Sequence, residues 1–97
     1  MKKKNIKCPV CGKYNFESEN DFDICTVCGW ENDGVQYDDH NFAGGANDLS
    51  VNEARIEYFL LNAPNTRTRA SVLREEYKRS GGSRKEYVNK LNKLLNG

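Results

Sequence analysis

Long apolar runs are missing from this sequence of 97 residues, whose mean hydropathy is −0.85. No window approaches the roughly 18 apolar residues that a membrane-spanning helix needs. The N-terminus is basic, but Ile6-Lys7-Cys8-Pro9 follows where a secretion signal would have its apolar run. We therefore expect no membrane segment and no secretion signal. A cytoplasmic location follows as the expectation, and thiols stay reduced there.

Basic residues are absent from Tyr14 to Asp48. The same stretch holds nine acidic residues: Glu17, Glu19, Asp21, Asp23, Glu31, Asp33, Asp38, Asp39 and Asp48. From Arg55 to the C-terminus, ten basic residues stand against four acidic ones. The net charge of +1 therefore hides an acidic half and a basic half. Either the two halves attract each other, or they present faces to different partners.

Histidine is scarce, since His40 is the only one, and it follows Asp38 and Asp39. The sequence has no Ser/His/Asp set and no phosphate-binding glycine loop. Asp38, Asp39, His40 and the Asn47-Asp48 turn could form an acid–base site, but adjacent carboxylates on a polar loop are usually only solvated. We therefore predict that the chain is not an enzyme, and no small-molecule substrate is evident.

All four cysteines lie in two short stretches, CPVCG and CTVCG, at residues 8–12 and 25–29. Two residues between cysteines let both sulfurs meet one ion, and a glycine after each pair suits the open backbone of such turns. Four thiolates suit tetrahedral Zn²⁺ and leave no position for a catalytic water. We predict one structural Zn²⁺ bound by Cys8, Cys11, Cys25 and Cys28.

Other uses of the four cysteines are less consistent with the sequence. Iron in a rubredoxin-like site needs the same ligands, so it remains the alternative metal. A thioredoxin-like redox motif needs one Cys-x-x-Cys in a βαβ context, whereas two pairs in β structure are expected here. Disulfides are rare in a reducing compartment.

The sequence predicts a small α+β fold, with a zinc-ribbon-like domain at 1–49 and a helical region at 50–97 packed on it. Apolar and polar residues alternate in Tyr14–Glu17 and in Asp21–Ile24, and turn-prone Ser18-Glu19-Asn20 separates them. This pattern predicts a hairpin that pairs the two segments, with its apolar face inward. Trp30 is expected in the core.

Residues 31–49 are expected to form an ordered loop with turns at Asn32-Asp33-Gly34 and Gly44-Gly45. We expect Gly44-Gly45-Ala46-Asn47 to pack a tight turn against the helix that Ser50 opens.

Three helices are expected after residue 49. Ser50 and Glu53 fit a capping box for a helix from Val51 to about Asn62, which Pro64 ends. A second helix should run from about Arg67 to Ser80, capped by Asn65-Thr66 and ended by Gly81-Gly82. Ser83 and Glu86 fit another capping box, for a helix to about Leu95. The expected apolar stripes are Val51, Ala54, Tyr58, Phe59 and Leu61, then Ala70, Leu73 and Tyr77, then Tyr87, Val88, Leu91, Leu94 and Leu95.

Three separated blocks occur in order: CPVCG, DFDICTVCGWENDGVQYDD and NFAGGANDLSVNEAR. Over residues 7 to 59 the chain resembles the bacterial CPCC family of small cysteine-rich proteins. Val10 stands where many members have a third cysteine, and Val51 stands where leucine is usual. The resemblance implies a zinc-ribbon-like domain, and such small proteins are associated with immunity or antitoxin-like roles.

Together these features predict a non-catalytic, zinc-binding protein-interaction module, with a role of the immunity or antitoxin-like kind. Its acidic ribbon and loop would dock a basic protein partner. The alternative is a nucleic-acid-binding zinc ribbon that uses Lys2–Lys4 and the basic helices from Arg67 onward. Phosphates would repel the acidic hairpin, which disfavours this alternative.

Overall fold

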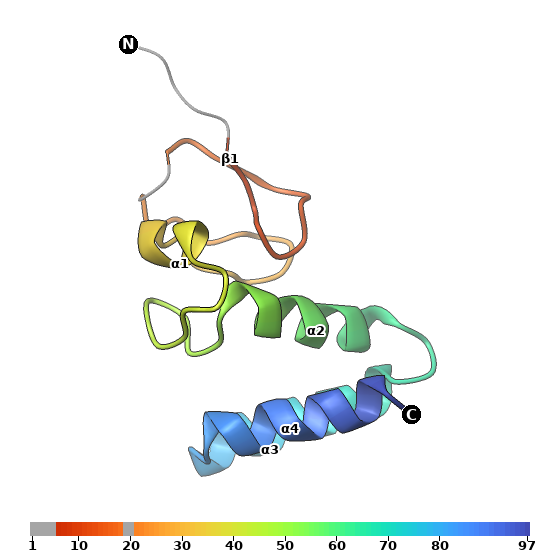
Figure 1. Cartoon of the computed structure of the whole chain (residues 1–97). Coiled ribbons are helices and arrows are strands. Elements are labelled where there is room, and N and C mark those ends of the chain that lie inside the picture. The colour runs from red at the N-terminus through yellow and green to blue at the C-terminus, as the bar shows by residue number, and fades with distance from the viewer. Residues whose placement is uncertain (1–5, 19–20) are drawn as a thin grey trace. The chain divides into compact units, whose positions relative to one another are not determined.

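The computed structural model describes residues 6–18 and 21–97. The chain divides into two compact units, Met1–Arg55 (unit 1) and Ile56–Gly97 (unit 2). Six elements follow one another: β1 (Ile6–Lys7), β2 (Asn15–Phe16), α1 (Gly34–Asp38), α2 (Val51–Asn62), α3 (Arg67–Ser80) and α4 (Arg84–Leu95) (Figure 1). A two-stranded hairpin near the cysteines, followed by helices, confirms the predicted α+β class. Among the described residues, no helix has the length and apolarity needed to cross a membrane.

The strand pairing differs from the prediction. Ile6 pairs with Phe16 and Lys7 with Asn15, antiparallel, so the hairpin β1–β2 encloses the first cysteine pair. A single antiparallel bridge, Ile24 to Glu31, encloses the second pair in the same way. The predicted pairing of 14–17 with 21–24 is therefore wrong, because each cysteine turn closes on its own flanks. Of the predicted turn, Glu19 and Asn20 lie outside the described residues.

The predicted inward face is correct only in its first half. Phe16 is fully buried, and the Tyr14 ring meets it edge-on with ring centroids 5.1 Å apart. Phe22 and Ile24, in contrast, are 52% and 53% exposed, because no second strand turns them inward. Trp30 is 4% exposed, which confirms its predicted place in the core.

A short helix, α1, lies where the sequence predicted only loop and turns. Asp33 caps it: the carboxylate accepts hydrogen bonds from the backbone N–H groups of Val35 and Gln36. An aspartate at this position satisfies amides that the first turn of a helix leaves free. The Asn32-Asp33-Gly34 signal was read as a turn, whereas it opens a helix.

The three long helices have the predicted bounds. Ser50 and Glu53 form the full capping box, because the Ser50 N–H donates to Glu53 Oε1 and the Glu53 N–H donates to Ser50 Oγ. Ser83 Oγ accepts from the Glu86 N–H, and Gly81 ends α3 in the left-handed conformation. Thr66 does not cap α3 through its side chain as predicted, since its hydroxyl donates to the carbonyl of Leu60 instead.

Unit 2 is a helical unit in which α3 and α4 lie side by side (Figure 1). Its buried apolar residues are Leu60, Ala70, Tyr87 and Leu91. Leu60 was missing from the predicted stripe, while Phe59 and Leu95, which were in it, are 57% and 41% exposed. At the C-terminal end of α2, the buried residue is therefore Leu60 and not the predicted Phe59.

Candidate metal centre

The four cysteine sulfurs come together in one cluster within unit 1. The Sγ atoms of Cys8 and Cys28 lie 3.6 Å apart, as do those of Cys11 and Cys25. All four sulfurs lie within 4.8 Å of one another, and the group could hold one metal ion. All four cysteines are free rather than joined in disulfides. It is the one such group of His, Cys, Asp and Glu among residues 6–18 and 21–97.

Each pair of ligands is held by the same backbone arrangement. The Gly12 N–H donates to the carbonyl of Cys8, and the Gly29 N–H donates to that of Cys25, both at 2.9 Å. The φ angles of Gly12 and Gly29 are 70° and 85°, in the left-handed region that favours glycine. The glycine after each pair is therefore part of the turn, as the sequence indicated.

Backbone amides also point at the sulfurs. The Lys13 N–H donates to Cys11 Sγ at 3.4 Å, and the Val27 and Cys28 N–H groups donate to Cys25 Sγ at 3.3 and 3.4 Å. Amide donors favour the charged form of the group they contact. These bonds suit thiolates, which are the form of cysteine that binds metals.

The thiols differ in acidity. The hydrogen bond from Cys28 lowers the pKa of Cys8 to about 5, against the opposing effect of burial. That same bond, together with burial, raises the pKa of Cys28, and burial raises the pKa of Cys11. A bound cation would favour all four thiolates, because a metal deprotonates the thiols that coordinate it.

The loop after the second cysteine pair is built around Gln36, which is fully buried. Its Nε2 lies 3.0 to 3.1 Å from the carbonyl oxygens of Phe42, Asn47 and Leu49. Its Oε1 accepts from the backbone and side-chain N–H groups of Asn47. The Gly44-Gly45-Ala46-Asn47 turn thus packs on α1, a contact that the sequence did not indicate.

Asn47 and Arg55 tie this loop and α2 to the cysteine turns. Asn47 Oδ1 accepts from the Glu31 N–H, and its Nδ2 donates to the Glu31 carbonyl, just after Trp30. Arg55 Nε donates to the carbonyl of Pro9 at 2.7 Å, inside the first cysteine turn. Residues of the blocks downstream of the cysteines therefore help to position the cluster.

The residues considered for acid–base chemistry have different surroundings. Asp38 and Asp39 are exposed at the end of α1, and Asp39 Oδ1 accepts from the Asn41 N–H. His40 instead lines an open hollow beside the first cysteine turn, together with Tyr37 and Arg55. Asp38 and Asp39 are not among the residues that line this hollow.

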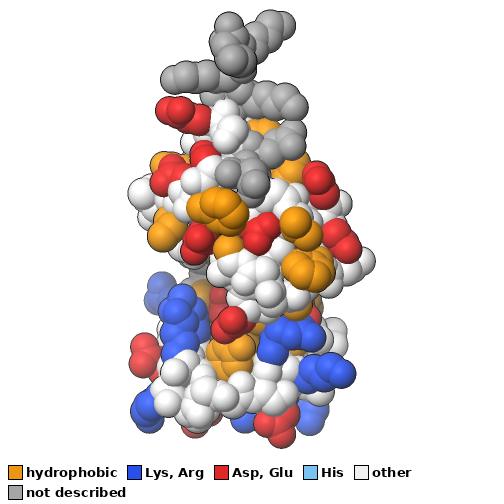
Figure 2. Space-filling view, turned by 90° about the vertical axis from the view of Figure 1, so that its left-hand side faces the viewer, with side chains coloured by type: hydrophobic (Ala, Val, Ile, Leu, Met, Phe, Trp, Pro, Cys, Tyr) orange, Lys and Arg blue, Asp and Glu red, His pale blue; other side chains and the backbone are white. Residues whose placement is uncertain are grey.

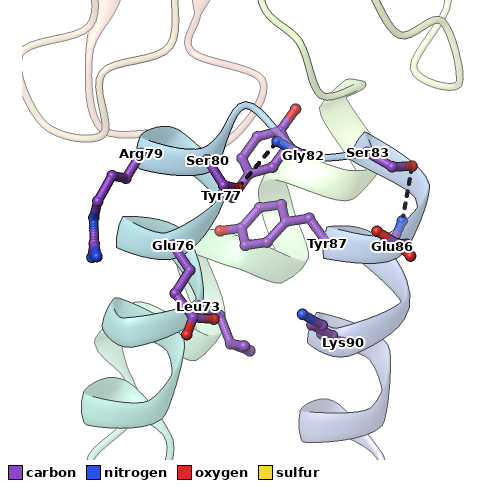
Figure 3. A pocket seen from close by; sticks show the side chains of 10 residues that line it. All are labelled: Leu73, Glu76, Tyr77, Arg79, Ser80, Gly82, Ser83, Glu86, Tyr87 and Lys90. Carbon is purple, nitrogen blue, oxygen red and sulfur yellow. Dashed lines mark hydrogen bonds between the residues drawn. The ribbon is translucent and has the colours of Figure 1, made fainter.

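A second hollow, of about 310 Å³, lies in unit 2 between α3 and α4 (Figure 3). The rings of Tyr77 and Tyr87 stack there in parallel, with centroids 4.4 Å apart. The hydroxyl oxygens of Ser80 and Ser83 accept hydrogen bonds from the backbone N–H groups of Gly82 and Glu86, at the turn between the two helices (Figure 3). The charged lining is balanced, with Glu76 and Glu86 against Arg79 and Lys90, so it favours no ligand charge.

The surface of unit 1 combines acidic and apolar side chains, which intermix over the cysteine-bearing unit in Figure 2. Phe22, Ile24 and Val27, around the second cysteine pair, are 46% to 53% exposed. Asp21 and Asp23 are exposed between and beside them. Phe22 has a φ of 56°, an uncommon conformation for an aromatic residue.

Comparison with known proteins identifies the family. A family model described as Cysteine-rich CPCC matches residues 6–79. No curated protein matches the chain. The matched residues include both cysteine pairs, α1, α2 and nearly all of α3, and end before α4. They therefore contain every contact described above that holds the cysteine cluster, and the chain belongs to the cysteine-rich CPCC family.

Proposed function

We propose that this protein is a non-catalytic interaction module whose unit 1 is held together by one Zn²⁺. The ligands would be Cys8, Cys11, Cys25 and Cys28. The observation that supports this most is the mutual distance of the four sulfurs, all within 4.8 Å. Four thiolates at about 2.3 Å from a tetrahedral ion would lie roughly 3.8 Å apart, close to the 3.6 Å of the two nearest pairs.

The proposed ion is structural. Catalytic zinc keeps one position open for water, and four thiolates fill all four positions. Neither Asp38 nor Asp39 lines the hollow that contains His40, which supports the non-catalytic proposal over the acid–base alternative. Thiolate ligands also need a reducing compartment, which agrees with a cytoplasmic location.

The proposed partner is a basic protein, and the interaction would be of the immunity or antitoxin-like kind. Residues 14–48 carry nine acidic residues and no lysine or arginine. The exposed apolar residues Phe22, Ile24 and Val27 lie within this acidic segment. Aromatic and aliphatic anchors within a charged rim are typical of protein interfaces, and the charge would raise the association rate and the specificity.

The metal is tested by elemental analysis and native mass spectrometry of the protein purified from cells. We expect one zinc per chain in the wild type. Cys25→Ser should lose the metal and the folded signals of unit 1, because structural zinc binding is coupled to folding. Unchanged metal content and melting in Cys25→Ser would refute the four-thiolate site. A redox-active visible band would assign iron instead of zinc.

The partner class is tested by affinity capture from the native host at low and high salt. The informative variant is Asp38→Lys/Asp39→Lys on unit 1, with Glu75→Lys/Glu76→Lys on unit 2 as a control of equal charge change. We expect basic proteins to be captured by the wild type and the control, and to be lost with salt or with the unit 1 variant. Equal capture by both variants would contradict the acidic docking surface.

A nucleic-acid-binding role is the second candidate. Unit 2 contains nine basic residues (Arg67, Arg69, Arg74, Lys78, Arg79, Arg84, Lys85, Lys90 and Lys93) against four acidic ones. Binding to phosphates would weaken steeply with salt. A mobility-shift titration at low salt with single- and double-stranded DNA and RNA tests it. The absence of any shift would remove this candidate.

A further inference from the structure

A hollow of about 580 Å³ opens beside the first cysteine turn and has no role in the proposed function. Residues 7–12 form one wall, and Tyr37, His40 and Arg55 form the rest. Unit 1 contains ten acidic residues, yet none of those that the structure describes lines this hollow. Its charged lining side chains, Lys7 and Arg55, are both basic. The hollow therefore brings two positive side chains together beside the cysteine cluster, in a unit that is acidic as a whole.

Most of the side-chain hydrogen-bond donors around the hollow have no acceptor among the described residues. Arg55 uses Nε on the carbonyl of Pro9, which fixes the side chain and leaves its terminal Nη edge available. Within residues 6–18 and 21–97, the side chains of Lys7, Tyr37 and His40 make no hydrogen bond or ion pair. Three donor side chains without an acceptor among the described residues, and an arginine that uses only its Nε, thus line one hollow.

We propose that this hollow binds a carboxylate group. The planar Nη edge of an arginine matches the two oxygens of a carboxylate, and Lys7 adds a second cation while Tyr37 and His40 add neutral donors. The neighbouring cysteine cluster favours a carboxylate over a phosphate, because Cys8 and Cys11 belong to the wall of the hollow. This preference rests on the proposed function: with a divalent ion and four thiolates the cluster would carry two negative charges, and it would repel a phosphate dianion more than a carboxylate monoanion.

The carboxylate has two sources, a small carboxylic acid or the C-terminus of a peptide. We would titrate the zinc-loaded full chain by nuclear magnetic resonance with acetate, triglycine, triglycine amide, inorganic phosphate and chloride at constant ionic strength. Saturable shifts of the Arg55 Nε–H and of the backbone N–H groups of residues 7, 8 and 10–12 are expected with acetate and triglycine. Saturation with acetate alone assigns a small acid, and tighter binding of triglycine than of its amide assigns a peptide C-terminus.

Two substitutions test the lining, and one serves as the control. Lys7→Gln and Tyr37→Phe should each weaken acetate binding, Lys7→Gln by about tenfold, since it removes a charged donor. Lys13→Gln removes a lysine of the same hairpin that does not line the hollow, and it should leave the affinity unchanged. Zinc content and spectral dispersion are measured for every variant, so a folding defect is recognised.

Several results would overturn the inference. These are the absence of saturation, equal shifts with chloride, tighter binding of phosphate than of acetate, or affinity that Lys7→Gln and Lys13→Gln change alike. The last would mean that Lys7 and Arg55 only compensate the charge of the thiolates. If any of these results is obtained while zinc is fully bound, the carboxylate site is refuted and the proposed function is unaffected. Loss of the four-thiolate site would instead appear in the zinc content.

Discussion

Gly45, in the loop of residues 39–49, packs closely against the start of α1. A Cβ added there would lie 2.6 Å from Asp33 Oδ2 and 3.0 Å from Gln36 Cδ. Both of these side chains are buried, and both are held by several hydrogen bonds. The second glycine of the Gly44-Gly45 pair is therefore required for close packing, and its φ is not in the left-handed region.

We predict that Gly45→Ala destabilises unit 1 by about 1 to 3 kcal/mol, because overpacking displaces side chains that have little freedom. Trp30 is the only tryptophan and is buried in this unit, so its fluorescence reports the unfolding. Denaturant titration of Gly45→Ala is compared with that of Ala46→Ser, a change at the exposed neighbour. Equal stability of the two variants would contradict the close packing.

Asp33 joins α1 to the same turn. Its Oδ1 accepts from the Val35 and Gln36 N–H groups, and its Oδ2 accepts from the Ala46 N–H. These backbone donors, Ala46 first, hold the pKa of the Asp33 carboxyl below its usual value. A lowered pKa means that the stabilisation is complete above the ordinary pKa of an aspartate and is lost as the pH falls through the lowered value.

We predict that Asp33→Asn destabilises unit 1 by about 1 to 3 kcal/mol, because an amide can replace the acceptor on only one side. The difference from the wild type should be the same at neutral and at mildly acidic pH, both of which lie above the lowered pKa. Denaturant titration followed by Trp30 fluorescence measures it. A difference that shrinks in mild acid would show that the carboxyl already titrates there, against the account.

At the scale of elements, α2 and α4 are joined within unit 2 by one polar contact. The Tyr87 hydroxyl donates to Glu57 Oε2 at 2.5 Å, and Arg74 of α3 lies 3.6 Å from the same oxygen. Burial, and then the contact with Glu57, raises the pKa of Tyr87, so the hydroxyl remains a donor into alkaline solution. This contact connects all three long helices.

We predict that Tyr87→Phe destabilises unit 2 by about 1 to 3 kcal/mol, because it leaves a half-buried carboxylate without its donor. Glu57→Gln keeps an acceptor for the hydroxyl and should have a smaller effect. Far-ultraviolet circular dichroism during denaturation measures both, and the double variant shows whether the two effects are coupled. If Tyr87→Phe proves no more destabilising than Glu57→Gln, the contact contributes little.

The elements also show which parts of the fold the sequence determines locally. The bounds of α2, α3 and α4 were predicted because their caps, such as Ser50 with Glu53, are signals within one turn. The strand partner of residues 15–16 was not predicted. Apolar and polar residues alternate within Tyr14–Glu17 and within Asp21–Ile24, but this pattern does not say which segment pairs with which. A strand partner is a non-local choice, and here it is made by closure of the cysteine turns.

The candidate site follows the same rule. The four cysteines were predicted to come together from their spacing, and their sulfurs do so. The contacts that hold them, Gln36 with Asn47 and Arg55 with Pro9, span 11 and 46 residues, and no local pattern indicates them. The burial of Gln36 was not predicted either, because glutamine in a polar loop is mostly exposed in proteins.

At the scale of the whole molecule, the two units differ in charge and in what stabilises them. Unit 1 has ten acidic and six basic residues, and it has only two-residue strands and one five-residue helix. A unit with so little regular structure and so small an apolar core needs a metal or another cross-link to be stable. Unit 2 is basic and consists of helices that pack on one another.

We propose that one zinc ion, held by Cys8, Cys11, Cys25 and Cys28, keeps unit 1 folded. The most direct measurement follows Trp30 fluorescence and bound zinc together while a chelator removes the metal. We predict one zinc per chain, a red shift of Trp30 emission in proportion to the zinc released, and recovery when zinc is restored. A metal-free protein with unchanged Trp30 emission would contradict the account.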